Sequence, residues 1–417
     1  MKVVIIAGGQ GTRIASVSSE IPKAMIPVAG KPVLEYEMEL ARRYGFTEFL
    51  FIIGHLGDQI ESYFGDGSKW GVNIDYYKEE KPLGTAGALG LIKDRLTEDF
   101  FVFYGDTVTD FDMEAMLDYH KAKHADATLF VHPNDHPYDS DIVELDTESR
   151  VTGFQHKPHP EGFISHNIVN AALFIFSPKV LEVIEPGTKC HIEKNVLPAC
   201  LDAGMNLYGY TSFEYIKDMG TPDRYHAVCE DVTRGKVADL NRSNKRKAVF
   251  LDRDGVINKE VNLLCKAEQM ELIPGAAEAI RYINNQGYLA IVVTNQPVIA
   301  RNLCTFEELD KIHATLETLL GKEGAYLNAI YFCPHHPDKG YPEERPEYKI
   351  ECNCRKPKPG MLFKAAEDWN VNLSQSFMIG DSDRDIQAGV AAGVKKSLKI
   401  ETNKEYELLN IVKTIIP

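Results

Sequence analysis

The sequence predicts two successive α/β domains, each built on a mostly parallel β-sheet. The 417 residues are too many for one ordinary hydrophobic core. An apolar strand running into a polar loop occurs twice, as VVIIAGGQGTR at 3–13 and as VFLDRDGVIN at 249–258. After each start, short apolar strands alternate with helical patterns, which is typical of βαβ units. Domains are therefore predicted over 1–235 and 248–417, with the polar, locally basic residues 236–247 as linker.

The first domain is predicted to contain a mixed sheet. Apolar strands are expected at 2–7, 48–54 and 100–106, and a helix at 33–45 ends at a glycine. From about 127 to 217 the strands follow one another more closely, with proline and glycine between them. This spacing favours antiparallel additions to the parallel strands.

The second domain repeats the α/β rhythm without repeating the first sequence. Strands are predicted at 248–252, 289–296 and 376–380, and a helix at 275–287. The helix from 305 opens with a capping box of Thr305 and Glu308.

Composition excludes several classes of protein. The formal charge of -15 argues against non-specific nucleic-acid binding, which depends on lysine and arginine. No apolar run approaches the roughly 20 residues of a membrane span, and VVIIA is too short for a signal peptide. A cytoplasmic location without membrane or nucleic-acid partners is therefore expected. The eight cysteines all lie at or after Cys190, which favours a metal site over a disulfide framework.

The first glycine-rich loop, AGGQGTR, has the features of a phosphate site. Gly8, Gly9 and Gly11 would let backbone N–H groups approach a phosphate, and Arg13 and Lys23 add positive charge. The loop has neither the dinucleotide G-x-G-x-x-G spacing nor the G-K-[ST] ending of a P-loop. By itself it is equally compatible with a plain tight turn.

The order G-G-x-G-T-R and then P-K resembles the sugar-1-phosphate nucleotidyltransferase family, a Rossmann-like fold. Later matches are PLGTAGAL, YGDTVTD, VNAALFIFSP, IEKNVLP and YIKDMGTPDRY. The resemblance implies nucleotide and sugar contacts from Gly8, Gly9, Gly11, Thr12, Gly84, Thr85, Gly87, Asn170, Glu193 and Lys194. Gln10 and Ala172 depart from the family pattern, where an apolar residue and a glycine are usual.

In that family a sugar 1-phosphate oxygen attacks the α-phosphorus of a nucleoside triphosphate, and pyrophosphate leaves. All partners are anions, so the protein must neutralise and align them. The resemblance implies that Asp106 and Asp218 hold Mg²⁺, that Arg13 faces the pyrophosphate, and that Lys23 and Lys194 face the phosphates being joined. No general base is required, because a phosphate dianion is already a nucleophile.

The second start, FLDRDGVIN, resembles the D-x-D motif of the haloacid dehalogenase superfamily, also Rossmann-like. The resemblance implies that Asp252 attacks phosphorus and that Asp254 acts as acid and then base. Thr294 in VVTNQ would bind the phosphoryl group and Lys356 in RKPKPGM would offset its charge. The implied Mg²⁺ ligands are Asp252, Asp254 and Asp381, with Asp385 in support.

A C-x-H and a C-x-C pair lie between the last two motifs. Cys333, His335, Cys352 and Cys354 are predicted to bind Zn²⁺ tetrahedrally, and four protein ligands make such a site structural. The alternative is unrelated thiols beside a surface histidine. His336 competes with His335, but the C-x-H spacing favours His335.

This cysteine loop resembles that of the D,D-heptose 1,7-bisphosphate phosphatases and the related histidinol-phosphate phosphatases. The resemblance places Arg355 and Lys356 on substrate phosphate and sugar, with Asn295 and Arg301 nearby. TNQPVIARN differs from the usual TNQSGIARG at Pro297, Val298 and Asn302.

The two resemblances imply one route. A bisphosphate phosphatase would make the sugar 1-phosphate that the first domain, which resembles the heptose 1-phosphate guanylyltransferases, would join to a nucleotide, with GTP favoured. The matching pathway supplies GDP-heptose for surface polysaccharide. Three alternatives stay open: a mannose or glucose 1-phosphate nucleotidyltransferase fused to another phosphatase, a histidinol-phosphate phosphatase half, and a catalytically silent half. The residues leave the base, the anomer, channelling and a homo-oligomer open.

Overall fold

A computed structural model describes the chain except residues 10, 12–13, 15–19, 339, 341–342 and 417. The chain forms two compact units. Unit 1 comprises Met1–His132, Val143–His156 and Asn170–Asn241. Unit 2 comprises Pro133–Ile142, Lys157–Val169 and Arg242–Pro417. Two segments of the predicted first domain thus belong to unit 2.

Unit 1 is built on a nine-stranded mixed sheet, which confirms the predicted class. Its order is β10-β9-β11-β6-β1-β4-β5, with β8 pairing both β11 and β12. Strands β1, β4, β5 and β6 are parallel, whereas β11 runs antiparallel to β6 and β9. The strand bounds are β1 Val3–Ala7, β4 Glu48–Ile53, β5 Asn73–Lys78, β6 Phe100–Tyr104, β8 Ala127–His132, β9 Ile142–Leu145, β10 Val151–Gln155, β11 Val169–Phe176 and β12 Leu207–Thr211.

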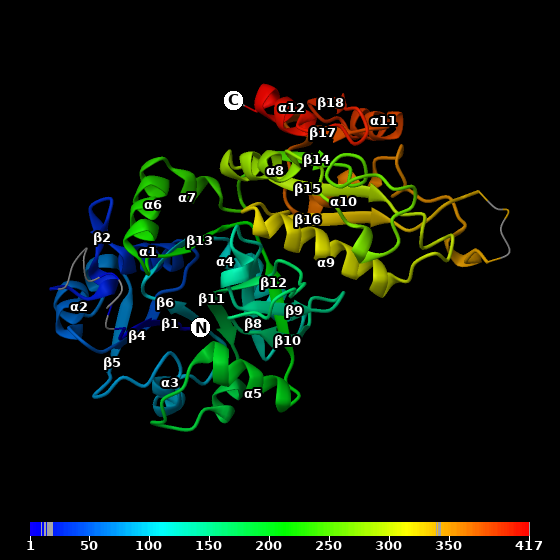
Figure 1. Ribbon diagram of the computed structural model, residues 1–417. Coiled ribbons are helices and arrows are strands. Elements are labelled where there is room, and N and C mark those ends of the chain that lie inside the picture. Colours follow the sequence, from blue (N-terminus) through cyan, green and yellow to red (C-terminus); the bar gives the residue numbers. More distant parts are fainter. Residues whose placement is uncertain (10, 12–13, 15–19, 339, 341–342, 417) are drawn as a thin grey trace. The chain divides into compact units, whose positions relative to one another are not determined.

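Helices cover both faces of this sheet. In Figure 1, α1 and α4 lie above strands β1, β4 and β6, and α3 and α5 lie below them. The bounds are α1 Val33–Arg43, α2 Gly57–Phe64, α3 Gly87–Leu91, α4 Met113–Ala122, α5 Leu197–Asp202, α6 Pro222–Thr233 and α7 Lys236–Asp239. Helix α1 follows its apolar period: Leu34, Met38 and Ala41 are buried, and Gly45 (φ +79°) ends it as predicted.

Two small antiparallel sheets complete unit 1. One pairs β2 Pro27–Val28 with β3 Lys31–Pro32, and the other pairs β7 Thr107–Asp110 with β13 Tyr215–Asp218. Part of the predicted linker is folded here, because α7 buries Val237 in a cluster with Tyr215 and Val228.

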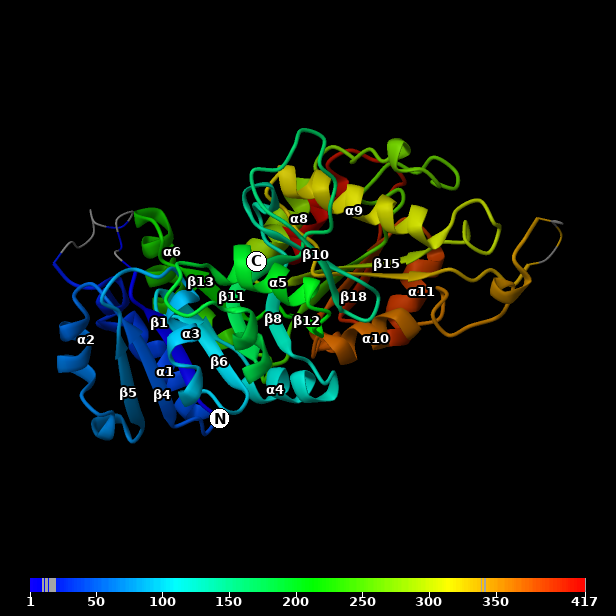
Figure 2. The ribbon, with the colours of Figure 1, turned by 90° about the horizontal axis from the view of Figure 1, so that it is seen from below.

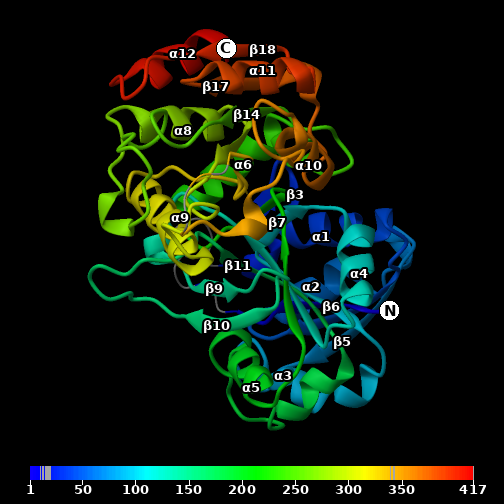
Figure 3. The ribbon, with the colours of Figure 1, turned by 90° about the vertical axis from the view of Figure 1, so that its right-hand side faces the viewer.

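Unit 2 carries a five-stranded parallel sheet in the order β16-β15-β14-β17-β18. Figure 2 shows α8 and α9 on one side of β15 and β18 and α10 and α11 on the other, and Figure 3 shows α11 beside β17 and β18. The bounds are β14 Ala248–Leu251, β15 Leu289–Asn295, β16 Ala329–Cys333, β17 Phe377–Gly380, β18 Lys396–Lys399, α8 Ala276–Asn285, α9 Phe306–Lys322, α10 Gly360–Asp368, α11 Asp383–Ala392 and α12 Glu407–Ile415.

Helix α9 begins at the predicted capping box. The Glu308 backbone N–H donates to Thr305 Oγ1 at 3.1 Å, and the Thr305 N–H donates to Glu308 Oε2 at 2.7 Å. Its apolar residues Leu309, Ile312 and Leu316 are buried in the unit 2 core. Among the described residues, no helix has the length and apolar composition needed to cross a membrane.

Candidate active sites

The first candidate site starts at the glycine loop after β1. A Cβ at Gly9 would meet open space, so packing does not require glycine there. A Cβ at Gly8 would lie 2.4 Å from Glu79 Oε2, so glycine lets the Glu79 carboxylate lie against the loop. Gly11 has a φ of +63°, which favours glycine. The predicted Thr12 and Arg13, and the variant Gln10, lie outside the described residues.

The loop predicted to contact the base is held against residues 188–192. Thr85 Oγ1 accepts a hydrogen bond from the Ile192 N–H at 2.8 Å. A Cβ at Gly84 would lie 2.2 Å from the Cys190 carbonyl oxygen, and one at Gly87 would lie 2.5 Å from that of Thr188. Both glycines are therefore required by this close backbone approach.

The predicted sugar contacts lie on two elements, and the first is β11, which carries Asn170. Glu193 and Lys194 belong to a short π-helix, Ile192–Val196. The Tyr104 hydroxyl donates to Glu193 Oε1 at 2.6 Å, which places Glu193 at the end of β6, two residues from Asp106. Burial, with the Glu193 charge, raises the pKa of Tyr104, so it stays a donor. Sequence reasoning missed Tyr104, although it ends β6 and directly precedes Gly105 and Asp106.

Ala172 stands where the family pattern has glycine, and the backbone explains the preference. Its φ is +57°, in the left-handed region, and its N–H donates to Asn170 Oδ1 at 3.1 Å. We expect Ala172→Gly to raise the free energy of unfolding of unit 1 by about 1 kcal/mol, measured by denaturant titration. Ala171→Gly, in the same strand without a positive φ, should lower it; stabilisation by neither change would contradict the assignment.

The residues that carry the two predicted metal carboxylates of unit 1, Asp106 and Asp218, are backbone neighbours. Strands β7 and β13 bring them together, because the Met219 N–H donates to the Asp106 carbonyl at 3.0 Å. Lys23 forms an ion pair with Asp106. Arg224, which sequence reasoning missed, donates from Nη1 to both Asp218 oxygens at 2.8 and 3.0 Å. Two carboxylates held by cations suit a divalent ion shared with phosphates.

Glu37 supports this metal edge from behind. Its side chain is fully buried on α1, and its Oε1 accepts from the Thr107 hydroxyl at 2.6 Å. Burial raises the pKa of Glu37 well above its usual value. The Glu37 side chain therefore fixes Thr107, the residue that follows Asp106, through this hydrogen bond.

The second candidate site lies at the carboxyl end of the unit 2 sheet, after β14, β15 and β17. Lys356 Nζ lies 2.9 Å from Asp252 Oδ1 and 2.6 Å from Asp385 Oδ1. Oxygens of Asp252, Asp381 and Asp385 lie within 4.8 Å of one another, so they could hold a metal ion. Burial raises the pKa of Asp252 to about 7, and the Lys356 ammonium opposes this.

The structure does not bring the Asp254 carboxylate into this metal group, where the sequence placed it. It accepts hydrogen bonds from Arg253 (2.9 Å), Asn258 (2.9 Å) and Gln296 (2.8 Å), while Asp385 occupies the metal group instead. Burial alone would raise the pKa of Asp254, but the Arg253 guanidinium and these donors lower it. Arg253, Asn258 and Gln296 were missed; the only signal for Arg253 is its place between the two aspartates.

Residues at the carboxyl end of β15 position the backbone of Lys356. Asn295 Nδ2 donates to the Lys356 carbonyl and the Lys356 N–H donates to Asn295 Oδ1, both at 3.0 Å. Thr294 is buried at the strand end, and its Oγ1 accepts from Gln296 at 2.9 Å. The predicted phosphoryl-site residues of unit 2 are thus assembled at one edge.

The four predicted zinc ligands also come together. Cys354 Sγ lies 3.3 Å from both Cys333 Sγ and Cys352 Sγ and 3.5 Å from His335 Nδ1. A tetrahedral Zn²⁺ with Zn–S bonds of 2.3 Å has S–S edges of roughly 3.8 Å, so the residues fit this ion. Hydrogen bonds from the other thiols lower the pKa of Cys354 to about 5. His336 lies outside the group, and its Nδ1 accepts from the Asp338 N–H at 3.2 Å.

Two arginines adjoin the metal loop. Arg355 Nη1 donates to the His335 carbonyl at 2.8 Å. Burial and the charges of Arg355 and Arg301 lower the pKa of His336. Within the described part of the chain, the buried Arg301 Nε has no hydrogen-bond partner. These cations suit an anionic substrate.

Comparison with known proteins assigns both halves. Residues 2–235 match the model of the nucleotidyl transferase family, and residues 209–393 match that of haloacid dehalogenase-like hydrolases. A UTP–glucose-1-phosphate uridylyltransferase of Synechocystis sp. is 33% identical over 55% of this chain and 62% of that protein. A mannose-1-phosphate guanylyltransferase of Mycobacterium tuberculosis is 33% identical over 56% and 64%.

The C-terminal half has other relatives. A D-glycero-beta-D-manno-heptose-1,7-bisphosphate 7-phosphatase of Pasteurella multocida is 38% identical over 38% of this chain and 84% of that protein. The chain spans less than two thirds of the length of the two nucleotidyl transferase relatives above. The chain therefore belongs to the nucleotidyl transferase family over residues 2–235 and joins to it a haloacid dehalogenase-like hydrolase.

Proposed function

We propose that the chain is a bifunctional enzyme of nucleotide-activated heptose synthesis. Unit 2 removes the 7-phosphate of D-glycero-D-manno-heptose 1,7-bisphosphate, and unit 1 joins the resulting heptose 1-phosphate to a nucleotide. The observation that carries the proposal is that one chain holds Asp252, Asp381 and Asp385 beside Lys356, and also holds Asp106 and Asp218 where strands β7 and β13 pair. The relatives support the substrates: the product of a heptose 1,7-bisphosphate 7-phosphatase is a sugar 1-phosphate.

In the phosphatase step, Asp252 attacks phosphorus, the bond from phosphorus to the sugar oxygen breaks, and an aspartyl-phosphate forms. Lys356 offsets the charge on both carboxylate and phosphate. Asp254 protonates the leaving oxygen and then accepts a proton from the water that hydrolyses the intermediate. A phosphate dianion beside Asp254 favours its protonated form against the pull of Arg253. The residues Asp252, Asp381 and Asp385 would hold Mg²⁺, which supplies charge neutralisation.

In the transfer step, an oxygen of the sugar 1-phosphate attacks the α-phosphorus of the nucleoside triphosphate, and pyrophosphate leaves. Asp106 and Asp218 would hold Mg²⁺, which would supply positive charge to neutralise the reacting phosphates. Lys23 and Lys194 neutralise the phosphates being joined, and we assign Arg13 to the pyrophosphate. Glu193, held by Tyr104, accepts from the sugar hydroxyls.

We further propose GTP as the nucleotide. The guanine edge carries the N1–H and N2–H₂ donors, and the Glu79 carboxylate, an acceptor, lies against Gly8 of the nucleotide loop. Glu79→Gln should lower kcat/KM for GTP by about 10- to 100-fold and affect UTP less, as measured by pyrophosphate release with each triphosphate. Glu80→Gln, at the next and more exposed position, is the control. An equal decrease in kcat/KM with GTP and UTP would show that Glu79 does not select the base.

The cysteine cluster is proposed to hold one structural Zn²⁺. Cys354→Ser should abolish zinc binding, which elemental analysis of the purified chain measures, and should lower the melting temperature of unit 2. Cys265→Ser, a cysteine outside the cluster, should retain one zinc per chain. Full zinc content in the Cys354 variant would contradict the assignment.

A hexose acceptor is the second candidate, because both nucleotidyl transferase relatives are named for hexose 1-phosphates. The test supplies heptose 1-phosphate, mannose 1-phosphate and glucose 1-phosphate separately with GTP and Mg²⁺. We expect the highest kcat/KM with heptose 1-phosphate. A higher kcat/KM with either hexose 1-phosphate would contradict the heptose acceptor and identify that hexose as the substrate. A histidinol-phosphate phosphatase half is tested in the same way against heptose 1,7-bisphosphate.

A further inference from the structure

Two segments of the nucleotidyl transferase half, 133–142 and 157–169, pack in unit 2 and are called the docking arm. They follow β8 and β10 in sequence, and Figure 2 shows them alongside α9. We propose that the docking arm is a positioning element of the phosphatase, which holds α9 so that Arg253 keeps Asp254 in place. The inference rests on the proposed phosphatase step.

An ionic contact fixes the arm to the middle of α9. His166 Nδ1 lies 2.6 Å from Glu317 Oε2, and His166 Nε2 lies 3.1 Å from Asp310 Oδ1. Burial would lower the pKa of His166, but the hydrogen bonds to Asp310 and Glu317 raise it to about 10. The ring is therefore an imidazolium at neutral pH and bridges two carboxylates two turns apart on the helix.

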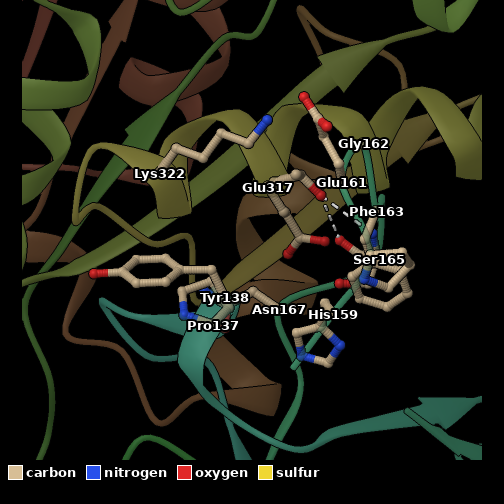
Figure 4. A pocket seen from close by; sticks show the side chains of 12 residues that line it. Pro137, Tyr138, His159, Glu161, Gly162, Phe163, Ser165, Asn167, Glu317 and Lys322 are labelled. Atoms are coloured by element: carbon tan, nitrogen blue, oxygen red, sulfur yellow. Dashed lines mark hydrogen bonds between the residues drawn. The ribbon is translucent and has the colours of Figure 1, made fainter. Parts of the chain in front are cut away.

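A second contact fixes the register between arm and helix. The Thr318 hydroxyl accepts from the Ser165 N–H at 3.1 Å and donates to the Ser165 carbonyl at 3.0 Å (Figure 4). The two segments of the arm are also joined to each other. The buried Asn167 donates to the Asn134 carbonyl at 2.7 Å and accepts from the Asn134 N–H at 3.1 Å.

A glycine in α9 is explained by the arm. Gly321 is buried within the helix, where glycine is less favourable than alanine. A Cβ at this position would lie 2.5 Å from Pro137 Cγ of the arm. The close approach of Pro137 therefore requires the glycine, which indicates that the sequence of α9 is adapted to the arm.

The next residue on this face of α9, His313, lies near Arg253, the arginine that binds the proposed catalytic acid Asp254. His313 lies on α9 between Asp310 and Glu317, within one turn of each, and is almost fully buried. Burial, and then the charges of Arg253 and His166, hold its pKa far below the usual value. His313 is therefore a neutral side chain near both cations. A shift of α9 would change the packing around Arg253, which is fully buried.

Arg253 depends on this packing. Its Nε and Nη2 donate to Asp254 at 3.1 and 2.9 Å, while its buried Nη1 has no hydrogen-bond partner among the described residues. Leu251 and Val256, which flank Arg253 in the sequence, belong to the same buried hydrophobic cluster as Leu309, Ile312 and Leu316 of α9, so the helix packs against the segment that carries this guanidinium. Displacement of the helix would therefore misplace the carboxylate that protonates the leaving oxygen and then accepts the proton of the hydrolytic water.

The contact between arm and helix is not a close-packed core. A cavity of about 290 Å³ remains between them, and Figure 4 shows its lining. Its lining includes Tyr138, His159, Phe163, Glu317, Thr318 and Lys322. Because this cavity leaves space beside the contacts described above, single substitutions at those contacts should loosen the arm without unfolding unit 2.

The test uses the full-length chain and p-nitrophenyl phosphate as phosphatase probe. His166→Ala and Gly321→Ala should each lower kcat about tenfold at unchanged KM and shift the pH profile of kcat. His166→Arg, which keeps the cation, should restore most of the activity. Thr318→Val should lower kcat, whereas Thr315→Val, whose hydroxyl donates to the Lys311 carbonyl of its own helix, should not.

Nucleotidyl transfer by the same samples, within twofold of wild type, shows that the chain is folded. Hydrogen exchange of peptides from α9 should rise in His166→Ala and Gly321→Ala. Faster exchange with unchanged kcat and pH profile would overturn the positioning role, and unchanged exchange would overturn the hold itself. If the proposed heptose substrate is wrong, the wild-type chain will hydrolyse p-nitrophenyl phosphate but not heptose 1,7-bisphosphate. This result is distinct from those that test the docking arm.

Discussion

Asp252→Asn should lower orthophosphate release from heptose 1,7-bisphosphate by at least about 10,000-fold, because the amide cannot form the aspartyl-phosphate. Nucleotidyl transfer to added heptose 1-phosphate should stay within twofold of wild type. Both rates are measured on one preparation, orthophosphate by colorimetry and pyrophosphate by a coupled assay.

The matched control for this variant is Asp383→Asn. Asp383 lies on the neighbouring α11, is largely exposed, pairs with Lys399, and lies outside the metal group. It should retain phosphatase activity. If Asp252→Asn abolished both reactions while the fold stayed intact, the two-site account would be wrong, because one carboxylate would then serve both.

Asp106→Asn should have the converse effect. It removes one of the two carboxylates assigned to the metal of unit 1, and it leaves Lys23 without its ionic partner. We expect kcat for nucleotidyl transfer to fall by at least about 100-fold, since the charge of the joined phosphates is then poorly neutralised. Phosphate release from the bisphosphate should be unchanged.

The control for Asp106 is Asp75→Asn, an exposed carboxylate paired with Arg95 in the same unit. It should change neither rate. Raising the Mg²⁺ concentration should partly restore the Asp106 variant, because a weakened ligand set raises the metal Kd. Wild-type transfer by Asp106→Asn at limiting Mg²⁺ would exclude the assigned metal site.

Local sequence signals predicted the features that local geometry determines. The capping box of Thr305 and Glu308 depends on residues three apart, and the structure has it. The α/β class follows from strand and helix periods, and it is confirmed. The cysteine cluster follows from two short spacings, C-x-H and C-x-C, which the structure brings together.

Features that depend on distant residues could not be predicted in this way. The Asp254 carboxylate accepts hydrogen bonds from Arg253, Asn258 and Gln296 and does not face the metal group. No spacing of residues in the sequence predicts this orientation. The sequence assigns the docking arm to the first domain, because its partners on α9 lie about 150 residues further along the chain. The residues that neighbour Gly321 in the sequence give no indication that Pro137 packs against it.

The linker shows the same limit. Residues 236–247 are polar and basic, which is typical of a connection between domains. Yet Val237 is buried in unit 1, and Arg246 pairs with the backbone of Asn370 in unit 2. Tertiary burial of a few side chains overrides the composition of the segment.

The most direct test of the central claim follows three products in one reaction. The wild-type chain is incubated with Mg²⁺, heptose 1,7-bisphosphate and each nucleoside triphosphate in turn, and orthophosphate, pyrophosphate and sugar nucleotide are measured separately. The account predicts orthophosphate in every tube, with pyrophosphate and sugar nucleotide formed mainly with GTP and only after orthophosphate. Orthophosphate without sugar nucleotide from any triphosphate would contradict it.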